Sequence, residues 1–228
     1  MASEFEQSRS EEGSSVLDEL AVGREIDGIQ LQTAVARSEF KRTFKGWSVE
    51  DATFVAIKFY RTEAGQDSSD ENFLDRIVEQ INRFNGIEDE GLLHIADVGV
   101  YKGLIYTVTE WLEGGNLAKR LEERDGDLLG RADELVLRLC RTLDRCHRAE
   151  VVHGNLKATN VLFDGNGRPR LTDFSVPLLS HSLKHNGEAG GYLAPELREA
   201  PEHQTPRCDV FSLGTIAYEL LTGREFRF

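Results

Sequence analysis

A series of short motifs in the second half of the chain constrains the fold more than any other feature of the sequence. Residues 153–160 read HGNLKATN, and residues 173–175, which begin thirteen positions after Asn160, read DFS. They are followed by APE at residues 194–196 and DVFSLG at residues 209–214. Each motif alone has an ordinary structural explanation, because Asn or Asp can form a turn and Pro can occupy the first turn of a helix. Their joint order and spacing have no such explanation.

The first half of the chain reads mainly as strands with one helix. Residues 54–57 (FVAI) form a compact, partly β-branched run, and residues 94–99 and 104–108 predict two further strands. Residues 62–71 are polar and rich in Gly, Ser and Asp, which indicates a loop. Apolar side chains then recur at helical spacing and predict one amphipathic helix. These side chains are Phe73, Ile77, Ile81 and Phe84.

The second half of the chain reads mainly as helices. One helical face carries Leu135, Val136, Leu139, Leu143 and Cys146. Residues 161–163 and 170–172 flank the sequence DGNG, which predicts a hairpin. Residues 210–221 predict a long apolar helix that Gly223 caps. Strands followed by helices, rather than an alternation of the two, indicate the α+β class.

Charge and composition exclude several classes of function. The chain has 27 basic and 40 acidic residues, a net charge of −13, which argues against binding to nucleic acid or to anionic membranes. No apolar run approaches the roughly 18 residues of a membrane-spanning helix, and the acidic N-terminus is unlike a signal peptide. The three cysteines lack CxxC spacing, so a disulfide framework or a zinc site is not expected. A reducing, cytoplasmic location follows as the expectation.

On the motifs given above, the chain resembles the protein kinase family, of the eukaryotic-like serine/threonine type. The resemblance covers about Gly23 to Gly223. It implies a bilobal α+β fold, with a small antiparallel-sheet N-lobe at residues 23–110 that carries one main helix, and a helical C-lobe at residues 111–228. The Ser- and Glu-rich residues 1–22 predict a disordered leader. Because kinases carry further helices, the C-lobe is expected to be incomplete after its central helix, as in a fragment of a longer protein or a lobe that needs a partner.

The resemblance implies a site for ATP and magnesium. Lys58 corresponds to the lysine that holds the α- and β-phosphates, and Asn160 and Asp173 correspond to the two magnesium ligands. The other implied nucleotide-binding residues are Thr109 as gatekeeper, Glu110 and Leu112 in the hinge, Ala56 and Leu162 around the adenine, and Ala36, Ser38 and Lys41 in the phosphate loop.

The catalytic loop departs from the family pattern H-R-D-L-x-x-x-N. Gly154 stands at the Arg position and Asn155 at the Asp position, so the group that accepts the substrate proton is replaced by an amide. General-base assistance is worth roughly 10²–10⁴-fold, and transfer should be slowed accordingly. Lys157 resembles the lysine that steadies the transferred phosphoryl group. Without the Arg, activation by phosphorylation at Ser180 or Ser182 is not expected.

Three other features of the family site are altered. Ala36, Ser38 and Lys41 replace the three glycines of the phosphate loop, and Lys41 could either cap the phosphates or fill their site. The helix acid that pairs with Lys58 could be Asp75, Glu79 or neither. Ser175 replaces the glycine of DFG and stiffens that hinge.

Two packing roles complete what the resemblance implies. His153 and Phe174 are expected to lie in the packed core, and Asp209 is expected to hold the backbone of the catalytic loop.

Three functions remain open from the sequence. The first is a pseudokinase, which binds nucleotide weakly and serves a protein partner as a regulator or scaffold. The second is a weakly active serine/threonine kinase, since positioning and metal electrostatics carry much of phosphoryl transfer. The third is a structural domain in which Lys41 or the stiffened loop excludes nucleotide.

Overall fold

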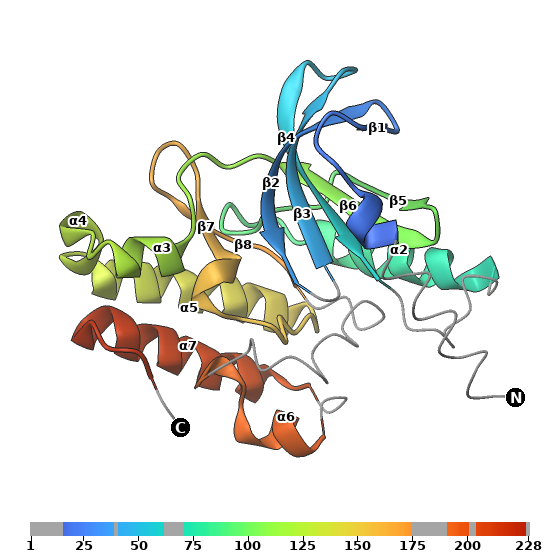
Figure 1. The fold of residues 1–228 in the computed structure, drawn as a ribbon. Coiled ribbons are helices and arrows are strands. Elements are labelled where there is room, and N and C mark those ends of the chain that lie inside the picture. The colour runs from blue at the N-terminus through green and yellow to red at the C-terminus, as the bar shows by residue number, and fades with distance from the viewer. Residues whose placement is uncertain (1–15, 39–40, 62–70, 175–190, 201–203, 227–228) are drawn as a thin grey trace, which may run out of the picture. The chain divides into compact units, whose positions relative to one another are not determined.

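A computed structural model describes residues 16–38, 41–61, 71–174, 191–200 and 204–226, and the chain divides into two units (Figure 1). One unit comprises Met1–Ile81 with His94–Trp111, and the other comprises Asn82–Leu93 with Leu112–Phe228. The segment Asn82–Leu93 belongs with the second unit because Phe84, Ile87 and Leu92 are buried in the core of that unit. The expected boundary between the lobes, after residue 110, therefore differs from this division at two places. Asn82–Leu93 groups with the second unit, and Trp111 groups with the first.

The first unit is an antiparallel sheet of six strands with the beginning of one long helix. The sheet order is β1-β2-β3-β4-β6-β5. Its strands are β1 (Glu25–Ile26), β2 (Ile29–Arg37), β3 (Lys41–Ser48), β4 (Thr53–Tyr60), β5 (Asp97–Tyr101) and β6 (Leu104–Glu110), and the helix is α2 (Glu71–Asn85). The predicted strands at residues 54–57 and 104–108 and the predicted amphipathic helix are confirmed. The strand predicted at residues 94–99 is confirmed only from Asp97, because β5 begins there and continues to Tyr101.

Residues on β4 alternate between the two faces of the sheet, as strand geometry requires. Val55, Ile57 and Phe59 are at most 6% exposed and belong to the hydrophobic core of this unit. Ala56 and Lys58 therefore lie on the opposite face of the sheet.

A short helical turn at residues 16–19 precedes the sheet. Leu17 and Leu20 are 3% and 2% exposed and belong to the same core. Arg42 on β3 donates from Nη1 to the carbonyl oxygens of both leucines, at 2.7 and 2.8 Å. The prediction of a disordered leader through residue 22 is wrong for these last residues, because two apolar side chains anchor them. Residues 1–15 lie outside the described part of the chain.

The second unit is mainly helical. Its elements are α3 (Leu117–Glu122), α4 (Gly126–Leu129), α5 (Ala132–Arg148), the 3-10 turn η1 (Ala158–Asn160), the hairpin β7 (Val161–Phe163) and β8 (Pro169–Leu171), α6 (Pro195–Glu199) and α7 (Pro206–Thr222). Side chains of α5, α7 and the hairpin meet in one core. A sheet unit followed by a helical unit confirms the α+β class.

The hairpin turn between β7 and β8 and the C-terminal end of α7 lie where the sequence predicts them. Asp164 Oδ1 accepts the backbone N–H groups of Asn166 and Arg168 at 2.9 and 2.8 Å, which closes the β7–β8 turn. Gly223 has φ of 64°, and its N–H donates to the Glu219 carbonyl, so it caps α7 as expected. Of the loop predicted at residues 62–71, residues 62–70 lie outside the described part of the chain, and Glu71 begins α2. The features expected of Ser175, Ser180 and Ser182 also lie outside the described residues.

Candidate functional site

Strand register brings several implied nucleotide-binding residues of the first unit to one face of its sheet. Ala56 on β4 pairs with Thr109 on β6. Lys58, two residues along β4, pairs with Thr43 on β3, and Thr43 pairs with Ala36 on β2. Paired residues share a face of the sheet, as do residues two apart on one strand. Ala36, Ala56, Lys58 and Thr109 therefore share the face opposite the core.

The turn between β2 and β3 holds the remaining phosphate-loop residues. Lys41 opens β3 and pairs with Tyr60, which lies two residues beyond Lys58 on β4. The Ser38 N–H donates to the Lys41 carbonyl at 2.8 Å. Cβ atoms at Ala36 and Ser38 stand where the family carries glycine, so the backbone has less room to approach phosphates there.

Lys58 is a buried lysine, with 7% of its surface exposed. On α2, Ile77 is fully buried, while Asp75 and Glu79 are exposed. An exposed carboxylate interacts only weakly with a lysine because water screens the pair. The pairing of Lys58 with Asp75 or Glu79 stays a prediction.

The implied hinge begins at the end of β6. Thr109 is buried, and its hydroxyl donates to the Glu110 carbonyl at 3.3 Å. Glu110 is exposed and pairs with Val55 on β4, and the Trp111 N–H donates to the Phe54 carbonyl at 3.2 Å. These contacts join the end of β6 to β4.

In the second unit, Leu162 is the half-buried residue of β7. Its neighbours Val161 and Phe163 are at most 1% exposed and belong to the core. Leu162 therefore faces away from that core, as an adenine contact requires. Leu112, which follows the hinge, is also half-buried.

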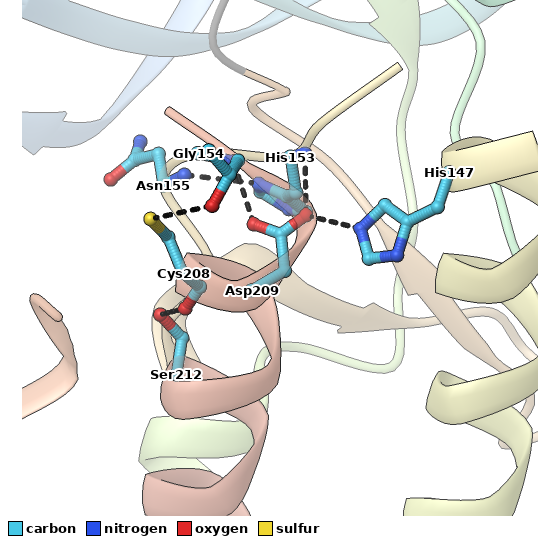
Figure 2. Close-up of polar contacts among 8 residues, drawn as sticks. His147, His153, Gly154, Asn155, Cys208, Asp209 and Ser212 are labelled. Carbon is cyan, nitrogen blue, oxygen red and sulfur yellow. Dashed lines mark hydrogen bonds and ion pairs between the residues drawn. The ribbon is translucent and has the colours of Figure 1, made fainter. Parts of the chain in front are cut away.

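The carboxylate of Asp209 on α7 holds the start of the catalytic loop, as Figure 2 shows. Asp209 is 1% exposed and accepts the backbone N–H groups of His153 and Gly154, each at 2.8 Å. Its Oδ2 also lies 2.7 Å from Nε2 of His147, in the last turn of α5. A buried carboxylate needs such partners, and these contacts confirm the predicted role of Asp209.

His153 is a packed core residue rather than an exposed acid or base. It is fully buried, and its ring stacks on Phe174 with a centroid distance of 4.2 Å. Phe174 in turn lies 4.5 Å from the ring of Phe84. Burial lowers the pKa of His153, although the nearby Asp209 carboxylate opposes that shift. The predicted packing roles of His153 and Phe174 are confirmed.

Asn155 and Asn160 are joined by a hydrogen bond across the loop. Asn160 is 3% exposed, and its Nδ2 donates to the Asn155 carbonyl at 2.7 Å. The Asn160 carbonyl accepts the Thr172 N–H at 3.0 Å, which ties the loop to the strand before Asp173. Because Nδ2 is engaged, Oδ1 is the Asn160 atom suited to a cation.

Two residues of this region adopt left-handed backbone conformations. Gly154 has φ of 68°, which glycine adopts without steric penalty. Asp173 has φ of 59°, which is uncommon for a residue with a Cβ atom.

The donor types at Asn160 and Asp173 fit magnesium. Mg²⁺ prefers oxygen ligands and is commonly held by one or two carboxylates together with substrate phosphates. Among the described residues there is no cluster of three or more His, Cys, Asp and Glu side chains that could hold a metal ion. Lys157 precedes η1 and is half-buried, and its backbone carbonyl accepts the Asn160 N–H at 2.9 Å.

Sequence reasoning missed two partners of this region. His147 was not recognised as a partner of Asp209; the available signal was a histidine in the last turn of a helix directly before the HGN motif. The Cys208 thiol donates to Glu196 of α6 at 3.5 Å, and the Ser212 hydroxyl donates to the Cys208 carbonyl at 3.0 Å (Figure 2). The first of these contacts links α6 to α7, and the second lies within α7.

Comparison with known proteins identifies a family model and several similar proteins. The family model described as "Protein kinase domain" matches residues 32–227. A probable serine/threonine-protein kinase of Bifidobacterium longum is 30% identical over 175 residues, 75% of this chain and 23% of the relative. A RasGEF domain-containing serine/threonine-protein kinase of Dictyostelium discoideum is 26% identical over 88% of this chain and 20% of its own length. A CBL-interacting protein kinase of Oryza sativa is 27% identical over 85% of this chain and 41% of its own length.

The chain thus spans less than half the length of these three relatives. Within the described parts of the chain, none of the helices combines the length and apolar character that crossing a bilayer demands.

Proposed function

The chain belongs to the protein kinase family, and we propose that within this family it is a pseudokinase. In this proposal it binds ATP with magnesium and acts as a regulatory or scaffolding module in the cytoplasm, with little or no phosphoryl transfer. A protein partner would read its conformation.

The observation that carries the proposal is Asn155 at the base position of an otherwise ordered loop. Asp209 holds the loop backbone, and Asn160 is fixed by its bond to the Asn155 carbonyl. These contacts hold the loop backbone in place, and the side chain at the expected base position is an amide. An amide can orient a hydroxyl but cannot take its proton at neutral pH.

Nucleotide binding is proposed from the residues that are retained. Lys58 and Thr109 lie on the same sheet face as Ala56, which suits an adenine and phosphate surface. Asn160 and Asp173 supply oxygen donors for the magnesium that accompanies the phosphates, and bound magnesium would neutralise phosphate charge. The altered glycine positions predict a weak site.

A weakly active serine/threonine kinase is the second candidate, because Lys58, Asn160 and Asp173 are all present. In that case Asn155 would orient the substrate hydroxyl, and Lys157 would steady the transferred group. The substitution Asn155→Asp should then raise the rate of phosphoryl transfer by about 10²-fold or more. An unchanged rate would count against this candidate.

Transfer of radiolabelled phosphate from ATP to a generic protein substrate tests the proposal. We expect the purified chain to transfer no more label than its Asp173→Ala variant. Robust transfer that Asp173→Ala abolishes would overturn the pseudokinase assignment.

A further inference from the structure

The residues 16–20, which we call the anchor, contact both strands of the β2–β3 hairpin directly before its turn. Arg37 on β2 and Arg42 on β3 are paired at this point of the ladder. Arg37 Nη2 donates to Asp18 Oδ1 at 2.6 Å, and Arg42 donates to backbone carbonyls of the anchor. The strand pair that precedes the implied phosphate loop is therefore held by a segment that comes earlier in the chain.

Arg42 meets the anchor on the core face of the sheet. It lies two residues from Phe44, which is 1% exposed and belongs to the core of this unit. Residues two apart on a strand share a face, so Lys41 and Thr43 lie on the opposite face. Thr43 pairs with Lys58 on that opposite face. The anchor thus holds the hairpin from the side away from the implied nucleotide-binding residues.

Several contacts fix the side chain of Arg42. Its Nη1 donates to the Leu17 and Leu20 carbonyls at 2.7 and 2.8 Å. Its guanidinium also lies 5.4 Å from the centroid of the Phe44 ring, within the range of a cation–π contact. Hydrogen bonds from a charged donor are roughly twice as strong as neutral ones. Because both leucine side chains are buried in the core, the carbonyls that Arg42 contacts belong to a fixed backbone.

Two neighbouring carboxylates of the anchor reach different parts of the unit. Asp18 contacts Arg37 of the hairpin, whereas Glu19 Oε2 lies 3.2 Å from Nζ of Lys102, between β5 and β6. The four side chains of these two pairs are at least 49% exposed, so each ion pair contributes little by itself. The contacts of Arg42 are therefore the main link between the anchor and the hairpin. The pair of Glu19 and Lys102 offers a control that does not involve the hairpin.

We propose that Arg42 is a positioning residue for the phosphate loop, and that through it the anchor sets how tightly the loop binds the phosphates of a nucleotide. This inference rests on the nucleotide binding proposed above. Lys41 directly precedes Arg42 on β3, and its carbonyl accepts the Ser38 N–H, so fixing Arg42 restricts where both loop residues lie. A loop that is ordered before the ligand arrives loses less conformational freedom on binding and binds more tightly. Release of the anchor would then weaken nucleotide binding without any change in the nucleotide-binding residues.

Three variants of the full chain test the proposal. Arg42→Met removes the hydrogen-bond donors and keeps an apolar side chain against Phe44, whereas Arg42→Lys keeps a charged donor. Lys102→Met is the matched control, because it also removes one positive charge and one contact of the anchor. Circular dichroism verifies that each variant is folded. If Arg42→Met does not fold, Arg42→Gln takes its place, with a neutral donor and the same expected direction of change.

Two measurements are made on each protein. Fluorescence titration gives the Kd for MANT-ATP in the presence of magnesium. Hydrogen exchange followed by mass spectrometry, without nucleotide, reports the protection of peptides that contain Ser38. We expect Arg42→Met to bind MANT-ATP about fivefold more weakly and its Ser38 peptides to exchange faster. Arg42→Lys and Lys102→Met should each stay within about twofold of the native Kd.

Four results would contradict this expectation, and they have different meanings. Equal Kd values for the native chain and Arg42→Met would overturn the positioning role while leaving nucleotide binding in place. Unchanged exchange of the Ser38 peptides in Arg42→Met would also overturn that role. Equal loss of affinity in Arg42→Met and Lys102→Met would overturn it too, because such a loss would reflect the removed charge alone. Absence of MANT-ATP binding to the native chain would instead overturn the proposed nucleotide binding, and this inference with it.

Discussion

Asp209 is the residue on which the geometry of the catalytic loop depends most directly. Its carboxylate accepts two backbone N–H groups of the loop and also contacts His147. The substitution Asp209→Ala would leave the buried N–H groups of His153 and Gly154 without an acceptor. We therefore expect the free energy of unfolding to fall by about 3 kcal/mol. Urea denaturation measures this change.

The matched control for Asp209 is Asp144, an exposed aspartate that pairs with Arg148 one turn along α5. Asp144→Ala should alter the free energy of unfolding by less than about 0.5 kcal/mol. If the two variants lose similar stability, Asp209 does not hold the loop.

His153 predicts how stability depends on pH. Burial lowers its pKa in the folded state, whereas an unfolded histidine titrates near 6.5. Below about pH 6.5 the unfolded chain therefore binds a proton that the folded chain does not, and stability falls as pH decreases. One proton contributes at most about 1.4 kcal/mol per pH unit.

Melting temperatures measured between neutral pH and pH 5 test this dependence. His153→Phe should make the profile flatter in that range, because the stacking partner Phe174 still receives an aromatic ring. His94→Phe, at an exposed histidine, should leave the profile unchanged. A native profile that is flat from pH 7 to pH 5 would contradict the buried neutral state of His153.

At the residue scale, the motifs predicted the roles of Asp209, His153 and Phe174 correctly, because each role follows from its position in a motif of fixed spacing. The contact of His147 with Asp209 was not predicted. This contact depends on how the end of α5 lies beside α7. The sequence periodicity of the two helices does not indicate which of their side chains meet.

At the scale of elements, the short anchor at residues 16–20 attaches the chain before the sheet to the β2–β3 hairpin. Arg42 donates to two of its carbonyls, and Arg37 pairs with Asp18 at 2.6 Å. Leu20→Ala removes a side chain that is 98% buried, so the free energy of unfolding should fall by about 2–3 kcal/mol.

Val22 provides the control for this anchor, since it lies two residues further on and is 57% exposed. Val22→Ala should change the free energy of unfolding by no more than about 0.5 kcal/mol in the same urea titration. Equal effects at Leu20 and Val22 would show that the anchor adds nothing to the core.

Periodicity and turn residues predicted α2, the β7–β8 hairpin and α7, because in each the local pattern agrees with the packing. The sequence did not predict the anchor, because its two leucines follow a Ser- and Glu-rich segment whose composition is typical of disorder.

At the scale of the whole molecule, the chain has the α+β architecture of its family, and the proposal concerns how much of the family's catalytic chemistry it keeps. Ala56, Lys58 and Thr109 share one sheet face, and Asn160 is held in its loop. In the proposal, Asn155 stands in place of the base. Retained architecture with an altered base favours binding over turnover.

A thermal-shift titration with ATP, with and without magnesium, tests the central claim most directly. A ligand that binds only the folded state stabilises it by about 2.7 kcal/mol at 100 times its Kd, which corresponds to a rise in Tm of about 5 °C or more for a chain of this size. We predict such a rise, dependent on magnesium, lost in Asp173→Ala and retained in Asp144→Ala. An unchanged Tm in folded native protein at saturating ATP and magnesium would contradict the account and would indicate a domain that excludes nucleotide.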